Sequence, residues 1–172
     1  CHISNFRKVK RVEDVIRIFA KVVKTRPSKL IFVGDGPERY HCEMLCRELS
    51  LCEHILFLGK VRDTSHVLNI SDVFMLPSET ESFGLAALEA MAVGVPVISS
   101  NTGGIPEVNL NGVTGFLSDV GDIDEMAKNV MKILGDDHNL KIYKSNAFET
   151  AKKFDINEVL PKYEELYHYL TN

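Results

Sequence analysis

The sequence predicts an α/β fold, a doubly wound and Rossmann-like parallel sheet that ends in a helical tail. Short continuous apolar runs alternate with amphipathic segments along the chain. Continuous runs are typical of parallel strands buried on both faces, and the amphipathic segments are typical of the helices that cover them. From Ile156 to Leu170 apolar residues recur at helical spacing, which predicts the tail.

Strands are expected at five apolar runs, which occupy residues 30–33, 55–58, 73–76, 95–98 and 115–117. The first residues, Cys1-His2-Ile3, resemble the end of a strand whose beginning is missing. We therefore expect residues 1–172 to be one excised domain of a longer protein.

Helices are expected before, between and after these strands, at residues 12–23, 63–70, 84–93 and 123–134, with a further helix after the strand at residues 30–33. That further helix would begin at Pro37, since proline is favoured in the first helical position, and Leu45 and Leu49 would share one of its faces.

Composition excludes several classes of protein. The chain is 45% hydrophobic and 26% charged, as globular domains are, and its net charge of −4 argues against a nucleic-acid surface. No run approaches the roughly 20 apolar residues of a membrane span. Four cysteines in 172 residues indicate reduced thiols in a cytoplasmic protein rather than a disulfide framework.

Ligands of such sheets bind beyond the carboxyl ends of the strands, so the loops there are the candidate site. The most informative loop leads from Pro77 into a helix near Phe83-Gly84-Leu85. The unpaired amides and the dipole at a helix start suit a phosphate, and Glu81 and Glu89 could accept hydrogen bonds from sugar hydroxyls. The alternative is that Glu81 or Ser82 caps the helix and Glu89 faces solvent.

A second loop carries the basic run Arg7-Lys8-Val9-Lys10-Arg11. At a strand end, a lysine can neutralise a diphosphate as a point charge. The alternative is an ordinary solvated run of basic residues.

Two glycine-rich turns follow other strands. Gly34-Asp35-Gly36-Pro37 lacks the spacing of a dinucleotide or P-loop motif, which favours a structural turn in which Asp35 caps the next helix. In Asn101-Thr-Gly-Gly-Ile-Pro-Glu107 the paired glycines would let the backbone approach a ligand, and Glu107 would fasten the loop. Structural and ligand-binding interpretations of this second turn both remain open.

Cys42 and Cys46 lie four residues apart, with His41 and Cys52 nearby, but no second ligand pair of the zinc-site kind follows. Buried thiols are therefore favoured over a zinc site.

The segment E-S-F-G-L-A-A-L-E, from Glu81 to Glu89, resembles the E-x₇-E motif of retaining glycosyltransferases of the GT-B fold, family four. V-F-M-L-P-S-E, E-A-M-A-V-G-V-P-V-I, G-G-I-P-E and N-G-V-T-G-F-L resemble that family too, in its order, so the resemblance covers the chain. The opening H-I-S-N-F-R-K-V-K-R-V is most similar to the N-acetylglucosaminyl–malate synthases, which make the first intermediate of bacillithiol.

The resemblance implies that the chain is the C-terminal, donor-binding domain of a bacterial glycosyltransferase whose acceptor domain is absent here. The implied reaction transfers N-acetylglucosamine from UDP-N-acetylglucosamine to L-malate. Alternatives are a family-four enzyme with another acceptor, a sugar-nucleotide 2-epimerase of the same fold, or a non-catalytic module that binds nucleotide sugars.

By the same resemblance, Glu81 would bind hydroxyls of the donor sugar and Glu89 the ribose. The distal phosphate would bind the backbone amides of Phe83, Gly84 and Leu85, and the neighbouring Ser82 is also expected to bind the substrate.

The family's basic pair, an arginine followed by a lysine, falls on Asn5 and Lys10. Lys10 matches and Asn5 departs, so Arg7 is an alternative source of the second charge. Val61 would contact uracil.

No metal or other cofactor is implied. The implied partners are a UDP-sugar and, through the absent domain, a small hydroxy acid. The oligomeric state is left open, a homo-oligomer included.

Overall fold

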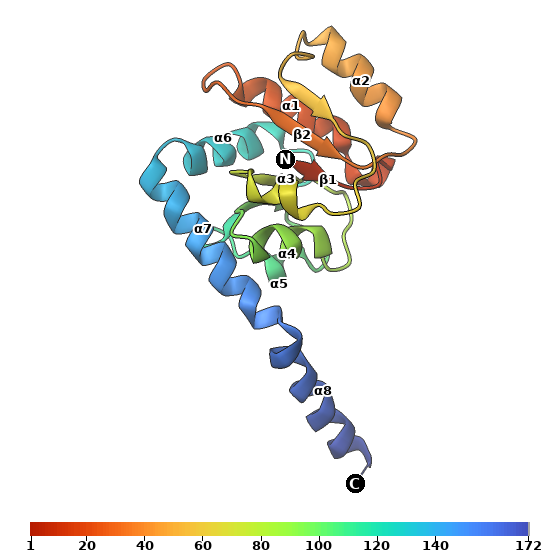
Figure 1. The fold of residues 1–172 in the computed structure, drawn as a ribbon, viewed down its shortest axis with the longest axis vertical. Coiled ribbons are helices and arrows are strands. Elements are labelled where there is room, and N and C mark those ends of the chain that lie inside the picture. The colour runs from red at the N-terminus through yellow and green to blue at the C-terminus, as the bar shows by residue number, and fades with distance from the viewer. Residues whose placement is uncertain (172) are drawn as a thin grey trace.

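The sheet layer consists of six short parallel strands in two groups of three (Figure 1). The first group is ordered β1-β2-β3 and the second β4-β5-β6. In the computed structural model, which describes residues 1–171, the strands are β1 (His2–Ile3), β2 (Leu30–Val33), β3 (Ile55–Phe57), β4 (Phe74–Leu76), β5 (Val97–Ser100) and β6 (Gly115–Ser118).

The two groups meet edge to edge through β1 and β4. The backbone N–H of Met75 donates to the Cys1 carbonyl at 2.9 Å. The His2 ring nitrogen Nδ1 lies 2.8 Å from the Met75 carbonyl, to which it donates. The strands therefore follow the order β3-β2-β1-β4-β5-β6, which is a doubly wound order with its switch point between β1 and β4.

Helices cover both faces of this sheet. Two short 3₁₀ helices, η1 (Lys8–Lys10) and η2 (Lys152–Phe154), lie in the connections. The helices are α1 (Val12–Val22), α2 (Arg39–Glu48), α3 (Ser65–Asn69), α4 (Leu85–Ala92), α5 (Ile105–Val108), α6 (Ile123–Leu134), α7 (Asp137–Ala151) and α8 (Ile156–Thr171).

The apolar core is divided into two clusters by the sheet. Ile98 packs in the cluster made with α1, α2 and α6. Its neighbour Val97 packs in the other cluster, with α4, α5 and α7. Successive strand residues point to opposite faces, so a continuous apolar run supplies both clusters. The predicted α/β fold with a parallel sheet is confirmed.

Several predicted boundaries are wrong for local reasons. The predicted run at residues 95–98 forms a strand only from Val97, because Pro96 has no N–H to donate to the ladder. Helix α2 begins at Arg39 rather than at Pro37. Asp35 does not cap it, because its carboxylate accepts from the adjacent Gly36 amide at 2.8 Å. Leu49 lies at the end of this helix, where it is 40% exposed.

Helix α7 was not predicted, although it has 15 residues. Its buried residues, Ala147, Thr150 and Ala151, are small and weakly apolar, so the segment lacks a clear hydrophobic stripe.

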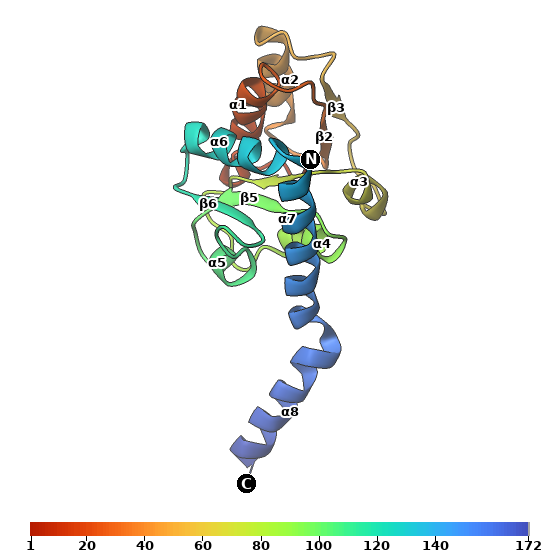
Figure 2. The ribbon, with the colours of Figure 1, turned by 90° about the vertical axis from the view of Figure 1, so that its left-hand side faces the viewer.

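The predicted tail is confirmed as α8, which projects from the body of the molecule as a continuation of the line of α7 (Figures 1 and 2). The large apolar side chains of its stripe are exposed, including Leu160, Tyr163 and Leu166. No helix among the described residues is both long and apolar enough to cross a membrane. The cytoplasmic location stays a prediction.

Candidate functional site

The loops that follow β1 and β4 meet at the switch point. The Lys10 ammonium lies 2.5 Å from a carboxylate oxygen of Glu81, and both side chains are largely buried. The loops are also joined through their backbones, since the Glu79 amide donates to the Val9 carbonyl at 2.8 Å. The basic run and the acidic motif, 71 residues apart in sequence, therefore form one site.

Helix α4 begins beside this ion pair. Gly84 is its N-cap residue and has a φ of 88°, a left-handed conformation that glycine adopts without strain. Within residues 1–171, the amides of Phe83, Gly84, Leu85 and Ala86 donate to no protein acceptor. No side chain caps this helix, so the alternative in which Glu81 or Ser82 does so is wrong.

The paired glycines of the loop after β5 support the site from behind. A Cβ atom on Gly103, whose φ is 54°, would lie 1.9 Å from the Glu81 carbonyl oxygen. One on Gly104 would lie 2.2 Å from that of Ser82. The Gly104 amide donates to the Glu81 carbonyl at 3.1 Å. The structural interpretation of these glycines accounts for both of them, because only glycine lets the two loops approach so closely.

Glu107 follows those glycines and is exposed. Its side chain forms no hydrogen bond or ion pair with the described residues, so the prediction that it fastens the loop is wrong.

The other predicted site residues lie around this centre as free surface groups. Glu89 is exposed on α4, and Asn5 and Arg7 are exposed between β1 and η1. In the described chain none of these three side chains has a hydrogen-bond or ion-pair partner. Val61, in the loop after β3, is 37% exposed. The structure thus brings Lys10 and Glu81 together but does not test the roles expected of the others.

Sequence reasoning missed His2, which lies under the junction of the two strand groups. It is fully buried, and burial lowers the pKa of its imidazole from 6.5 to about 4. Because Nδ1 donates to the Met75 carbonyl, Nε2 accepts from the Ser4 hydroxyl at 2.8 Å. His2 therefore connects β1 to β4 as a neutral ring. A histidine inside the apolar opening stub was the available signal.

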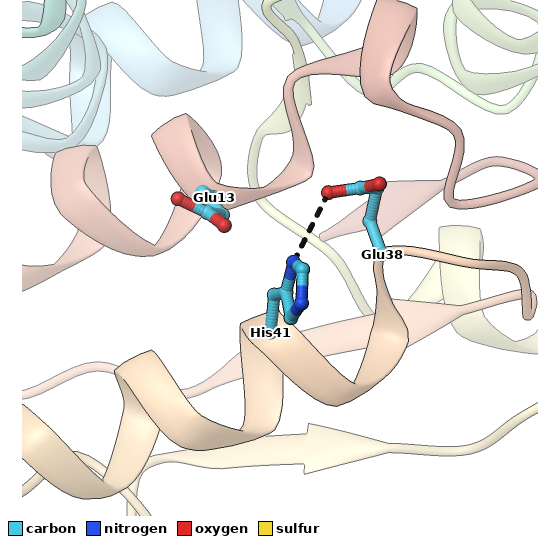
Figure 3. Close-up of side chains that lie close together, drawn as sticks. All are labelled: Glu13, Glu38 and His41. Carbon is cyan, nitrogen blue, oxygen red and sulfur yellow. Dashed lines mark ion pairs between the residues drawn. The ribbon is translucent and has the colours of Figure 1, made fainter.

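A second group of polar side chains lies between α1 and α2 (Figure 3). Glu13, Glu38 and His41 are the one set in the described chain whose ligand atoms could together reach a metal ion. His41 lies 3.6 Å from Glu38, and Glu13 pairs with Arg17 at 3.7 Å. The hollow beside them is also lined by Lys8 and Arg11, whose charges oppose a cation. Cys42 and Cys46 are buried thiols, as predicted.

A hollow of about 650 Å³ lies elsewhere. Its lining includes Pro27 to Lys29 and Ser71 to Val73, which precede β2 and β4. That is the amino end of the strands, opposite the edge at which doubly wound sheets bind ligands. The candidate site is therefore defined by the Lys10–Glu81 pair and the start of α4 rather than by this hollow.

The strand order and the groups gathered at its switch point define a Rossmann-like ligand-binding domain. The family model for glycosyl transferases group 1 matches residues 1–150, and the chain belongs to this family.

Individual relatives carry different names. The chain is 44% identical over 168 residues, 97% of its length, to N-acetyl-alpha-D-glucosaminyl L-malate synthase of Bacillus anthracis, of which it covers 44%. It is 32% identical over 84% of its length to a sulfoquinovosyl transferase of Arabidopsis thaliana, of which it covers 29%. The chain thus spans less than half the length of these relatives.

A crystal structure of Anabaena HepE in complex with UDP superposes with a TM-score of 0.90 at 27% identity, over 98% of this chain and 48% of that one. The family resemblance inferred from the motifs is confirmed.

Proposed function

We propose that this chain is the donor-binding domain of a retaining glycosyltransferase that transfers N-acetylglucosamine from UDP-N-acetylglucosamine to L-malate. The family and the 44% identity to a protein of that name support the proposal. The similarity to HepE, solved with UDP, supports a uridine nucleotide as the ligand.

One observation carries the proposal: a lysine ammonium, a carboxylate and four free amides lie together at the switch point. Lys10 and the start of α4 would hold the diphosphate, the lysine as a point charge and the amides of Phe83, Gly84 and Leu85 as donors. Ser82 lies beside these amides and is exposed.

The two carboxylates would bind the two sugars of the donor. Glu81 would accept hydrogen bonds from hydroxyls of the transferred sugar, and Glu89 from the ribose. Val61, in the exposed loop after β3, would lie against uracil. Arg7 and Asn5, exposed beside η1, are the candidates for a second contact to the diphosphate.

The reaction breaks the bond between the sugar's anomeric carbon and the distal phosphate. Negative charge then grows on UDP, and Lys10 and the α4 amides would stabilise it without a metal. The acceptor hydroxyl would attack from the face that UDP leaves, and the leaving phosphate would take its proton. Such a reaction retains the anomeric configuration and needs no protein nucleophile.

The acceptor is the part of the proposal that rests on the relative's name alone. The acceptor would bind a domain outside this chain, and the similarity to a sulfoquinovosyl transferase favours keeping other acceptors in the test.

Calorimetric titration with UDP tests the donor site. We expect binding by this chain to be the same with and without EDTA, and binding that disappears with EDTA would refute the metal-free site. An assay of the full-length protein against a panel of UDP-sugars and hydroxy acids tests the reaction. Turnover with an acceptor other than malate would support the proposed donor site and contradict the proposed acceptor.

A further inference from the structure

Two of the four cysteines lie in contact, away from the site described above. Cys46 belongs to the last turn of α2 and is only 3% exposed. Cys52 follows that helix and is exposed. Their sulfur atoms are 3.7 Å apart, with the Cys46 thiol donating to the Cys52 sulfur. A disulfide bond measures about 2.05 Å, so the sulfurs would have to approach by roughly 1.7 Å.

The backbone between the two cysteines is held in a defined turn. The Leu51 amide donates to the Cys46 carbonyl at 2.9 Å, and the Ser50 amide to that of Arg47 at 3.0 Å. Ser50 has a φ of 57°, so these bonds form the helix-ending motif that has a left-handed residue after the helix. One residue further on, Cys52 is placed back against the helix, so the thiol contact is a product of the turn.

We propose that Cys46 and Cys52 are a redox-active thiol pair, which a low-molecular-weight disulfide converts reversibly to an intramolecular disulfide. The Cys52 thiolate attacks one sulfur of the small disulfide, whose S–S bond breaks and releases one small thiol. Cys46 then attacks the Cys52 sulfur of this mixed disulfide and releases the second. Both protein protons end on the two small thiols, which balances the two-electron exchange.

The different surroundings of the two thiols assign the order of these steps. An exposed thiol can meet a disulfide from solution, whereas a buried one cannot. Burial also raises the pKa of the Cys46 thiol to about 12, so its thiolate is scarce. Cys52 is therefore the attacking residue and Cys46 the resolving one.

Cys42 serves as an internal control. It lies one turn before Cys46 on α2 and is fully buried. Burial raises the pKa of its thiol to about 12 as well. Among the described residues, it forms no hydrogen bond with another sulfur. The proposal requires proximity to Cys52, so Cys42 should stay reduced.

Oxidised glutathione is a suitable probe. The reduced chain is incubated with it under native conditions, its free thiols are blocked with N-ethylmaleimide, and its mass and tryptic peptides are measured. Cleavage at Arg47 separates Cys46 from Cys52, so only a disulfide joins peptides 40–47 and 48–60. We expect this joined peptide, the loss of two of the four alkylatable thiols, and full recovery with dithiothreitol.

Three variants assign the sulfurs. Cys42→Ser should form the joined peptide as the parent does. Cys46→Ser should stop at a mixed disulfide on Cys52, and Cys52→Ser should form neither the joined peptide nor a mixed disulfide on Cys42 or Cys46. A parent chain that stays reduced, that stops at the mixed disulfide, or that loses its joined peptide in Cys42→Ser would overturn the proposal.

Discussion

The two carboxylates of one motif lie in opposite surroundings. Glu81 is in the loop before α4, and Glu89 is on α4 itself. The Glu81 side chain is 16% exposed and paired with Lys10 at 2.5 Å. Glu89 is exposed on α4 and has no partner in the described chain. The two glutamates look equivalent in the sequence motif, but in the structure Glu81 is ion-paired and Glu89 is free.

This difference implies different behaviour towards a ligand. A diphosphate that binds Lys10 has to compete with the Glu81 carboxylate for the same ammonium. A hydroxyl that binds Glu89 displaces only water. The first region should thus exchange one ion pair for another, whereas the second should gain a new hydrogen bond.

The largest effect that we expect is a loss of folding stability in acid, which would disrupt both regions together. Unfolded chains bind a proton at His2 below about pH 6.5, whereas folded His2 stays neutral down to about pH 4. The unfolded state then holds more protons, so stability falls as the pH is lowered through this window, by up to about 3 kcal/mol.

Urea unfolding from pH 7 to pH 4 measures this slope. His2→Gln should flatten it, and His66→Gln, which changes an exposed histidine, should not. Identical slopes in all three proteins would contradict the role of His2.

Lys10→Ala should have the next largest effect. It removes the charge that both Glu81 and the diphosphate use, and a hydrogen bond to a charged group contributes about 1.5–3 kcal/mol. We expect the affinity for UDP, measured by calorimetry, to fall roughly 10- to 150-fold. Lys8→Ala, two residues away and exposed, is the matched control. Equal losses of UDP affinity in both variants would show that Lys10 acts only as one of several surface charges.

Glu89→Gln should weaken UDP binding about tenfold, because the ribose loses a charged acceptor. The ribose does not change during the reaction, so the full-length enzyme should show a raised KM and a little-changed kcat. Glu107→Gln changes another exposed glutamate near the site and should leave both constants unchanged. A fall in kcat alone would place Glu89 at the reacting sugar instead.

Glu81→Gln should have the smallest effect on UDP. UDP has no transferred sugar, and releasing Lys10 from its ion pair should leave the affinity for UDP unchanged or raise it. In the full-length enzyme kcat should fall, because the transferred sugar gains positive charge in the transition state. If Glu81→Gln loses as much UDP affinity as Glu89→Gln, the contrast between the two regions is wrong.

The parts of the fold that sequence predicts well are those with a dominant physical requirement. Strands such as Leu30–Val33 are buried on both faces and must be apolar throughout. The ligand edge follows from chain direction, because parallel strands place their carboxyl ends together. The start of α4 was found through Gly84 and the glutamates on either side of it.

The parts that sequence could not predict depend on partners far along the chain. No local pattern pairs Lys10 with Glu81, and none shows that His2 would join β1 to β4. Helix α7 packs through small residues, so it lacks the periodic signal that identified α1. The Asp35 carboxylate could accept a hydrogen bond either from the start of α2 or from the adjacent Gly36 amide, and it accepts from Gly36.

The switch point also has a consequence for how the chain folds. Strand β1 pairs with β2 through residues such as His2 and Phe32, but its contacts to β4 join residues 73 apart, and Lys10 and Glu81 are 71 apart. Contacts of such separation close long loops and slow folding. Each group of three strands can therefore assemble independently of the other. The site exists only after the two groups have docked. A ligand held there stabilises the docked state alone, so the binding of UDP would report the last step of folding.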